Sequence, residues 1–246
     1  MKILKTILCV ACFAFLLPTT AHAQEAESSI MELMEYTIKF GENSKFTEGV
    51  KKWKKCYKDN NGTDTWNVWH RLQGKGNVYV GTSQFKNWAE MGESDDAAGK
   101  ACAAIAMEFI LPHIESTELS TTRSMPEYSN TATLGDNTIV WVTNFIVNDS
   151  EMFREAVNEM TSAIKKKEGN ARGWWYRYMG GESGHYMVSS PYKNFADLDT
   201  DKENIWKLYE AANGKTKTKD LKDKFKSVID KQWSYTYTLD KDLSMN

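Results

Sequence analysis

Two similar eight-residue stretches decide the fold that we expect for this chain. They read Ser83-Gln84-Phe85-Lys86-Asn87-Trp88-Ala89-Glu90 and Ser190-Pro191-Tyr192-Lys193-Asn194-Phe195-Ala196-Asp197. The same offset of 107 positions aligns residues 40–91 with residues 147–198 without a gap. Self-similarity at a fixed offset indicates a repeated structural unit. We therefore predict two homologous repeats, in residues 24–131 and 132–246.

The residue pattern in each repeat predicts the same order of elements, which is strand, helix, strand, strand, helix, strand. Period-two alternation from Met34 to Phe40 indicates the first strand. The helix after it is indicated by apolar residues that follow one helix face, namely Phe46, Val50, Trp53 and Tyr57. Glycine-containing turns join the middle two strands of each repeat, which is typical of hairpins. The remaining expected strands cover residues 66–72, 77–81, 117–124, 138–147, 174–179, 185–189 and 233–239.

Helix ends are predicted from glycine and serine. Gly62 and Gly169 follow the first helix of each repeat, where a C-terminal glycine belongs. Ser83 and Ser190 stand where the N-cap of the second helix is expected. That second helical region covers residues 97–110 in the first repeat, and residues 205–211 and on to 229 in the second.

The first 23 residues have the pattern of a secretory signal peptide. Met1–Lys5 is basic, Ile7–Leu17 is apolar, and Ala21-His22-Ala23 is a cleavage site of the A-x-A type. No later stretch approaches the roughly 20 apolar residues that a membrane helix needs. We expect a mature chain that begins at Gln24 and is periplasmic or secreted. A lipid anchor on Cys12 is the alternative, but its neighbours fit a lipobox poorly.

The composition is that of a globular protein with many aromatic rings. The 246 residues are 41% hydrophobic and 26% charged, and they include 9 Trp, 11 Tyr and 10 Phe. Such rings usually lie in cores, in partner surfaces or in pockets for flat ligands. Without the leader, 29 basic side chains stand against 33 acidic ones. This balance predicts no nucleic-acid partner.

Two of the four cysteines belong to the leader, so the mature chain keeps Cys56 and Cys102. An exported protein can form one disulfide from them. Their spacing does not demand a bridge, and we expect both to be small buried hydrophobes on helices. Spacings of the CxxC or HExxH type are absent from the sequence, so no metal site is predicted.

A strand that leads into an aromatic helix start occurs in both repeats, first as Val78-Tyr79-Val80-Gly81-Thr82-Ser83-Gln84-Phe85-Lys86-Asn87-Trp88. Together with the element order, it resembles the dimeric α+β barrel superfamily, whose best-known branch is the antibiotic-biosynthesis-type monooxygenases. The resemblance implies two ferredoxin-like βαββαβ units whose antiparallel sheets pair as an α+β barrel with the helices outside. Both units come from one chain, so a tandem pseudo-dimer is expected. Members of the superfamily often hold flat aromatic ligands, inside the barrel or between sheet and helices.

The haem branch of this superfamily fits the sequence poorly. Its members resemble one another in a tryptophan on the third strand and a histidine on the second helix that binds iron. Gly81 and Val188 occupy the comparable strand positions, and the comparable helices, at residues 94–102 and 199–212, contain no histidine. His113 follows later, beside Pro112, where a packed or capping role is expected. No cofactor is predicted.

The strand at residues 138–147 carries one polar side chain among apolar ones. Ile139, Trp141, Phe145 and Val147 form one alternating set, and Val140, Val142 and Ile146 form the other, which also contains Asn144. Apolar residues on both faces indicate a sheet that is covered on both sides. The Asn144 carboxamide therefore needs a hydrogen-bond partner or a ligand, and both interpretations stay open. The resemblance places Asn144 near a strand asparagine that some cofactor-free and haem-degrading members use, which makes it a candidate catalytic residue.

Other candidate site residues lie on the central hairpin strands. Trp69-His70-Arg71 and Tyr176-Arg177-Tyr178 occupy equivalent positions, and His185 begins a neighbouring strand. Alternation places His70 and Arg177 on one face and the other four residues on the opposite face. The pattern does not decide which face lines the barrel.

From these positions we select candidates for two roles. A histidine is the usual general base near neutral pH, so His70 and His185 are the candidate bases. The candidate ligand-binding residues are Trp69, Arg71, Tyr176, Arg177 and Tyr235. The alternative for the arginines is solvation or ion pairing at a barrel mouth. The lysine-rich ranges 165–167 and 215–226 are expected to be solvated helix faces, not polyanion sites.

We expect an exported α+β barrel protein that binds a small aromatic or apolar ligand, or a protein partner, without catalysis. No acid-base pair is defined by spacing, which favours this reading. The alternative is a cofactor-independent monooxygenase or isomerase that acts on a small aromatic or quinone-like substrate, with Asn144 and either His70 or His185 as its catalytic residues. The sequence leaves open whether the protein is an enzyme and whether the pseudo-dimer oligomerises further.

Overall fold

The barrel expected from the sequence forms the centre of the molecule. A computed structural model describes residues 27–93, 96–182, 184–200 and 203–245. In this part of the chain, strands close into a barrel in the order β1-β3-β2-β8-β5-β7-β6-β4, with every neighbouring pair antiparallel. The α+β class and the barrel are thus confirmed. The predicted leader lies outside the described residues. The strands are β1 (Ile30–Ile38), β2 (Asn67–Arg71), β3 (Asn77–Phe85), β4 (Ile114–Ser124), β5 (Ile139–Val147), β6 (Trp174–Gly180), β7 (Tyr186–Tyr192) and β8 (Ile229–Leu239).

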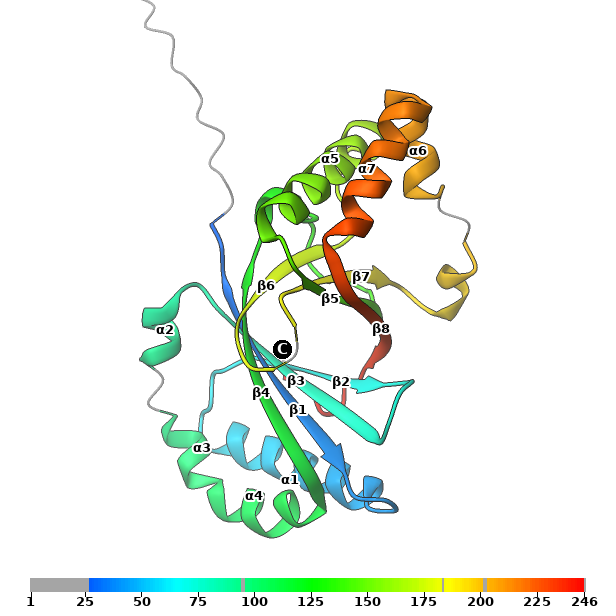
Figure 1. Cartoon of the computed structure of the whole chain (residues 1–246). Coiled ribbons are helices and arrows are strands. Elements are labelled where there is room, and N and C mark those ends of the chain that lie inside the picture. Colours follow the sequence, from blue (N-terminus) through cyan, green and yellow to red (C-terminus); the bar gives the residue numbers. More distant parts are fainter. Residues whose placement is uncertain (1–26, 94–95, 183, 201–202, 246) are drawn as a thin grey trace, which may run out of the picture.

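The long helices lie outside the barrel in two groups on opposite sides (Figure 1). One group contains α1 (Asn43–Asp59), α3 (Ala97–Ala101) and α4 (Ala103–Phe109), and the other contains α5 (Ser150–Glu168), α6 (Ile205–Asn213) and α7 (Lys215–Ser227). The short elements are α2 (Trp88–Gly92) and the 3-10 turns η1 (Leu111–His113), η2 (Pro126–Tyr128) and η3 (Phe195–Leu198). Among the described residues, no helix is long and apolar enough to cross a membrane.

Each half of the chain contributes four neighbouring strands to the barrel. β4, β1, β3 and β2 come from the first half, and β8, β5, β7 and β6 come from the second. The two sets meet along two seams. Arg71 pairs with Tyr237 where β2 meets β8, and Ser124 pairs with Tyr176 where β4 meets β6. The barrel interior is therefore lined by both halves of the chain.

Apolar side chains on the outer barrel face are buried under the helices. Beneath α5, the Phe153 ring lies 5.3 Å from the Phe145 ring and 4.8 Å from the Tyr186 ring. Beneath α1, the Phe46 ring lies 5.2 Å from the Tyr79 ring. Phe46 and Phe153 are 2% and 1% exposed, so each anchors its helix to the sheet. Because the outer faces are used in this way, the inner faces enclose a separate interior.

The predicted serine caps are wrong. Ser83 and Ser190 lie inside β3 and β7, which continue to Phe85 and Tyr192. β3 stays paired with β1, and β7 with β5, up to these ends. Strand pairing at Ser83 and Ser190 therefore prevents a helix from beginning there. The caps are Asn87 and Asn194, whose side chains accept hydrogen bonds from the backbone N–H of Glu90 at 3.0 Å and of Asp197 at 3.3 Å.

Other predicted boundaries shift as well, and two of them have a clear local reason. The strand expected at residues 34–40 is β1, which begins at Ile30 and ends before Phe40. Gly169 ends α5 with φ +81°, as predicted, whereas α1 ends before Gly62 and Asn61 adopts the left-handed conformation, with φ +60°. Gly62 is required for a different reason, since a Cβ there would lie 2.1 Å from the Tyr57 ring.

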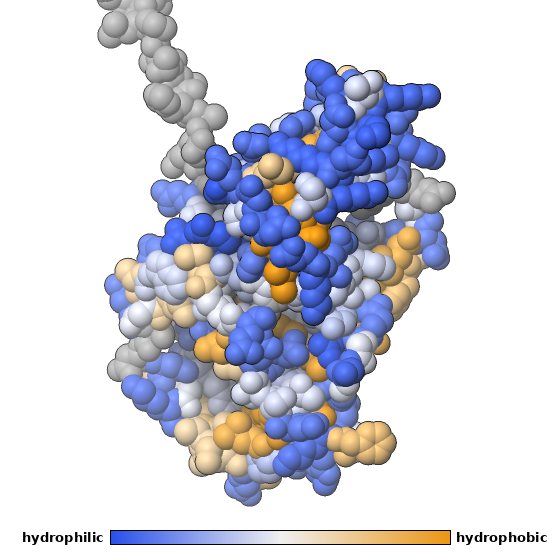
Figure 2. All heavy atoms as spheres, in the orientation of Figure 1, coloured by the Kyte–Doolittle hydropathy of each residue, from blue (hydrophilic) through white to orange (hydrophobic). Residues whose placement is uncertain are grey.

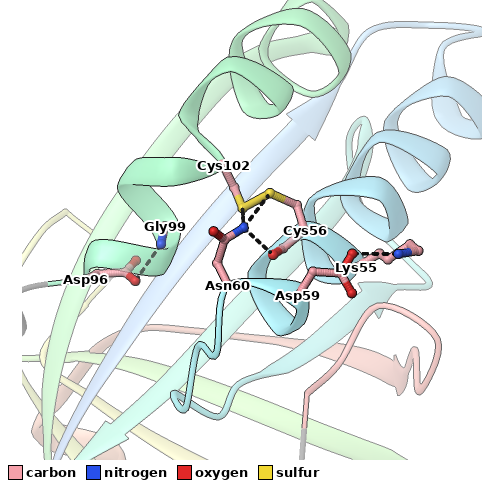
Figure 3. The surroundings of a disulfide bond; sticks show 7 residues. All are labelled: Lys55, Cys56, Asp59, Asn60, Asp96, Gly99 and Cys102. Carbon is pink, nitrogen blue, oxygen red and sulfur yellow. Dashed lines mark hydrogen bonds and ion pairs between the residues drawn. A yellow bond between two sulfur atoms is a disulfide. The ribbon is translucent and has the colours of Figure 1, made fainter.

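A disulfide joins Cys56 to Cys102, contrary to the expectation of two unbridged cysteines (Figure 3). It ties α1 to the junction of α3 and α4, with a Cα–Cα distance of 6.0 Å. Cys102 is fully buried, and the Asn60 amide donates a hydrogen bond to the Cys56 carbonyl at 3.0 Å beside the bridge. The two cysteines are 46 positions apart in the sequence and gave no local spacing signal, because helix packing brings them together.

Candidate functional site

The barrel encloses a cavity of about 740 Å³ that is lined by residues of all eight strands. This volume is within the range of about 300–1,000 Å³ that is usual for small-molecule sites. Side chains alternate along each strand, so every second residue points inward. The lining is mixed. Its apolar and aromatic members include Met31, Leu33, Trp69, Val80, Val142, Tyr176, Tyr178, Met187, Tyr235 and Tyr237, and its polar members include Glu35, Arg71, Thr82, Gln84, Glu118, Ser120, Asn144 and Ser189.

The structure decides which face of the hairpin strands lines the barrel. Trp69 and Arg71 of β2 line the cavity, as do Tyr176 and Tyr178 of β6. Arg177 points the other way and is exposed. Of the five candidate ligand-binding residues, Trp69, Arg71, Tyr176 and Tyr235 therefore share one cavity, and Arg177 lies outside it.

Asn144 lies in the cavity wall, bonded to a tyrosine of another strand. The Tyr178 hydroxyl donates a hydrogen bond to Asn144 Oδ1 at 2.9 Å and lies 3.4 Å from the sulfur of Met187. Asn144 is 6% exposed. Because Tyr178 occupies the carbonyl oxygen, the Asn144 amide N–H groups are the part of this side chain that can donate to a ligand. A ligand carbonyl or phenolate oxygen matches such a donor.

Arg71 forms a charged group at one end of the cavity. Its Nη1 lies 3.4 Å from Glu35 Oε1, Nη2 donates to the Lys75 carbonyl, and the guanidinium lies 4.6 Å from the Tyr235 ring centre. The Arg71 side chain is 8% exposed, and its Nε is buried without a hydrogen-bond partner in the described part of the chain. A buried cation with an unused donor is suited to an anionic or carbonyl oxygen.

Burial controls the ionisable groups around Arg71. It raises the pKa of the Glu35 carboxyl; the Arg71 charge opposes this rise and Glu118 adds to it. Burial also raises the pKa of Tyr237, with Glu35 adding to the rise and Arg71 opposing it. In the middle of the cavity, burial alone raises the pKa of Tyr176 to about 12. These tyrosines are neutral hydroxyl groups at physiological pH.

Neither candidate histidine lines the cavity. His70 points outward from β2; its Nε2 lies 2.7 Å from Asn77 Oδ1, and its ring stacks on Tyr79 at 4.6 Å. His185 precedes β7, and its Nδ1 lies 3.1 Å from both the backbone N and the backbone O of Val147. The structure therefore does not bring Asn144 together with a histidine. Side chains alternate along a strand, so His70 points outward because its neighbours Trp69 and Arg71 point inward.

Some cavity residues were missed by the sequence analysis. Glu35 lies on β1 in the inward set with Met31 and Leu33, and Met187 lies beside the Tyr178 hydroxyl. The sequence contains no signal for Glu35, because in the strand expected at residues 34–40 it alternates with Thr37 and Lys39 in the polar set. Met187 had no signal either. In the described lining, most aromatic rings come from the second half, namely Trp174, Tyr176, Tyr178, Trp233, Tyr235 and Tyr237.

The described residues that line the cavity include no histidine or cysteine. His113 lies elsewhere, with its Nδ1 2.8 Å from Glu42 Oε2. In the described chain, no group of three or more His, Cys, Asp or Glu residues is arranged to hold a metal ion.

Solved structures with the same fold were found at low sequence identity. A candidate monooxygenase from Lactobacillus acidophilus NCFM has a TM-score of 0.54 and 13% identity, over 89% of this chain and 99% of that chain. A candidate monooxygenase from Fusobacterium nucleatum has a TM-score of 0.52 and 11% identity, over 87% and 93% of the two chains. Chlorite dismutase from Candidatus Nitrospira defluvii, in complex with imidazole, has a TM-score of 0.51 and 11% identity, over 87% and 92%.

These similarities concern the fold alone. The closed eight-stranded antiparallel barrel with outer helices is shared with these solved structures and is consistent with a dimeric α+β barrel fold. No protein-family model matches the chain, and no curated protein matches its sequence. Function therefore has to be argued from the cavity itself.

Proposed function

We propose that this chain is an exported, tandem α+β barrel protein that binds a small, partly aromatic ligand inside its barrel. The observation that carries the proposal is the cavity of about 740 Å³, whose lining combines apolar and aromatic side chains with many polar ones. Its volume and its ring surfaces beside convergent polar groups are compatible with a small-molecule site. The ligand class follows from the lining: a flat ring system that carries a carbonyl or phenolic oxygen.

The polar groups provide two anchoring points for such a ligand. The Asn144 amide, oriented by the Tyr178 hydroxyl at 2.9 Å, donates to an oxygen near the middle of the cavity. Arg71 donates to a second oxygen at the charged end, beside Glu35. Trp69, Tyr176 and Tyr235 supply ring surface between these groups. A ligand with two oxygens on an aromatic frame, such as a quinone or a diphenol, uses both anchors.

The tandem organisation and the export are parts of the same proposal. Residues 24–131 and 132–246 are two repeats that form a pseudo-dimer within one chain. The 107-residue offset supports this reading, as does the contribution of four adjacent strands by each half. Residues 1–23 are a cleaved signal peptide, which supports a periplasmic or secreted location, and the disulfide between Cys56 and Cys102 is compatible with an oxidising compartment.

The second candidate function is cofactor-independent oxygenation or isomerisation of a quinone-like substrate. It is favoured by Asn144, which can polarise a substrate carbonyl in the cavity. The base in this reading is Glu35 instead of His70 or His185. Its carboxyl lines the cavity and has a raised pKa, which suits a proton acceptor closer to neutral pH. The names of the two candidate monooxygenases with this fold support the same reading.

Ligand binding is tested by titrating tryptophan fluorescence with a panel of quinones and phenols. We expect saturable quenching by at least one compound, because Trp69, Trp174 and Trp233 line the cavity. Asn144→Ala removes a donor to the ligand and should weaken binding about tenfold. Arg177→Gln is the matched control, because Arg177 is exposed outside the barrel, and it should bind like the wild type. Absence of saturable quenching with every compound would overturn the proposal.

Turnover separates the two candidate functions. A compound that binds is incubated with the protein in air, and oxygen consumption, product mass and chromatographic retention are followed, because an isomer differs from its substrate only in retention. An unchanged compound supports the binding protein. Product formation that is lost in Glu35→Gln, while the compound still binds, supports the enzyme.

A further inference from the structure

Helix α7 carries a row of lysines on one face. Lys215, Lys219, Lys222 and Lys226 follow the spacing i, i+4, i+7, i+11, which places them one above the other over about 16 Å of helix. These four residues are called the lysine stripe below. The buried residues of α7 are Thr218 and Leu221, at other angular positions on the helix. The surface over α5, α6 and α7 is correspondingly hydrophilic (Figure 2).

Much of the stripe is not neutralised by the protein. Lys219 pairs with Asp223 at 2.5 Å, and Lys222 lies 5.5 Å from the Trp206 ring. Lys215 is exposed, and no ion pair to it is found within the described residues. Lys226 is also exposed and shares the charge of Asp223 with Lys219. Lys207 of α6, also exposed, lines the same shallow hollow as Lys215, together with the acidic Glu210.

Helix α1 provides an internal comparison, because it is also rich in lysine. There Lys45, Lys51 and Lys55 pair with Glu42, Glu48 and Asp59 at 3.0 Å, 3.4 Å and 2.6 Å. Lys54 donates to the Asp242 carbonyl at 2.8 Å. The lysines of α1 are thus largely used within the molecule. The unpaired charge of α7 is a separate feature, and it lies on the opposite side of the barrel (Figure 1).

We propose that the lysine stripe docks the protein on a bilayer surface that is rich in anionic phosphate head groups. A straight row of cations on one convex helix can meet a plane of negative charge at several points. No large hydrophobic side chain of α6 or α7 is exposed in the described chain, so docking is electrostatic and does not insert side chains into the lipid. This proposal replaces the expectation that these lysines are only solvated.

One observation favours a bilayer over a nucleic acid, and the proposed export agrees with it. Bases of single strands are usually held by exposed aromatic rings, and the ring beside the stripe, Trp206, is half-buried and lies against Lys222. The predicted export also places the chain among membrane surfaces. Lys231, four residues after α7, is exposed and lines one end of the cavity. The lysine stripe and this part of the cavity wall are close in the chain, because β8 begins two residues after α7 ends.

The test is co-sedimentation with vesicles, using the chain from Gln24 onward, which contains every described helix and strand. We expect binding to vesicles of phosphatidylglycerol and phosphatidylcholine at about 50 mM salt, and release at about 0.5 M salt. Vesicles of phosphatidylcholine alone should not bind. Replacing Lys215, Lys219 and Lys226 by glutamine should weaken binding about a hundredfold, at about fivefold for each lysine.

The control replaces Lys45, Lys51 and Lys55 of α1 by glutamine, which changes the net charge equally on the other side of the barrel. It should bind within about threefold of the wild type, since those lysines already have partners. Circular dichroism melts establish that each variant is folded, and Lys215→Glu with Lys226→Glu serves as a second stripe variant. Equal loss in the control, wild-type binding by both stripe variants, or no wild-type binding to anionic vesicles would each overturn the proposal. Binding to single-stranded DNA without binding to vesicles would also overturn it, in favour of a different polyanion.

Discussion

At the scale of the residue, polar side chains from different strands interact with one another inside the cavity. Tyr178 and Asn144 come from different strands and meet at 2.9 Å. Arg71 reaches Glu35 at 3.4 Å across the same interior. The sequence analysis found Asn144 and Arg71 because each breaks an apolar or aromatic pattern on its strand. It could not find their partners, because pairing across the barrel depends on strand order and not on local spacing.

Tyr178→Phe tests the bond to Asn144. The change removes the hydroxyl donor and leaves the buried Asn144 Oδ1 without it, so the free energy of unfolding should fall by about 1–2 kcal/mol. Urea denaturation followed by circular dichroism measures it. Tyr235→Phe is the matched control, because no hydrogen bond of the Tyr235 hydroxyl is found in the described structure. Equal stability losses in the two variants would contradict the role given to Tyr178.

Tyr176 gives a prediction for alkaline pH. Burial raises the pKa of its hydroxyl from 10.0 to about 12 in the folded protein, so the folded state keeps a proton that the unfolded state loses. Stability from this group is present below pH 10 and declines as the pH rises toward 12, by up to about 1.4 kcal/mol per pH unit. Urea denaturation at several pH values should show a shallower decline for Tyr176→Phe than for the wild type. Parallel curves would contradict this.

At the scale of the element, sequence periodicity located the strands and long helices but not all of their ends. The alternation and the Phe46 helix face reflect burial, which acts all along an element. Ends depend on competition between local signals, and at Ser83 the pairing of β3 with β1 continues to Phe85. The disulfide was missed for a related reason. Cys56 and Cys102 meet only because α3 and α4 pack against α1.

Removing the disulfide should destabilise the protein. A bridge that closes a span of 46 residues restricts the unfolded chain, and its loss costs about 4 kcal/mol on the loop-entropy model. Guanidinium denaturation of Cys56→Ser with Cys102→Ser measures the change. Reductant should lower the wild type to the level of the double variant and leave that variant unaffected. A wild type insensitive to reductant would show that the bridge does not form.

At the scale of the whole molecule, the barrel couples the two halves. Each half supplies one side of the cavity, and the seams β2–β8 and β4–β6 connect them. Self-similarity in the sequence and the resemblance to a known superfamily made the α+β barrel predictable. The cavity itself was not, because the sequence did not show which strand faces point inward. Alternation along the strand placed His70 on one face and Trp69 and Arg71 on the other. Only the closed barrel in the structure showed that the face with Trp69 and Arg71 points inward.

One cooperative unfolding transition is therefore expected for the whole chain. Neither half has a complete interior, and separating them would expose the cavity walls and four strand edges. Tryptophan fluorescence and far-UV circular dichroism should give the same denaturation midpoint. Two resolved transitions would show that the halves fold independently.

The closure of the barrel through β8 also constrains folding during synthesis. Trp69 of β2 pairs with Leu239 of β8, 170 positions later in the chain. The edge of β2 that faces β8 thus stays unpaired until β8 has been made, and contacts of such long sequence separation form slowly. A chain that lacks β8 carries an open sheet edge, which is the structure most prone to pair with a neighbouring copy. Strand β8 is therefore the strand that protects this edge from aggregation.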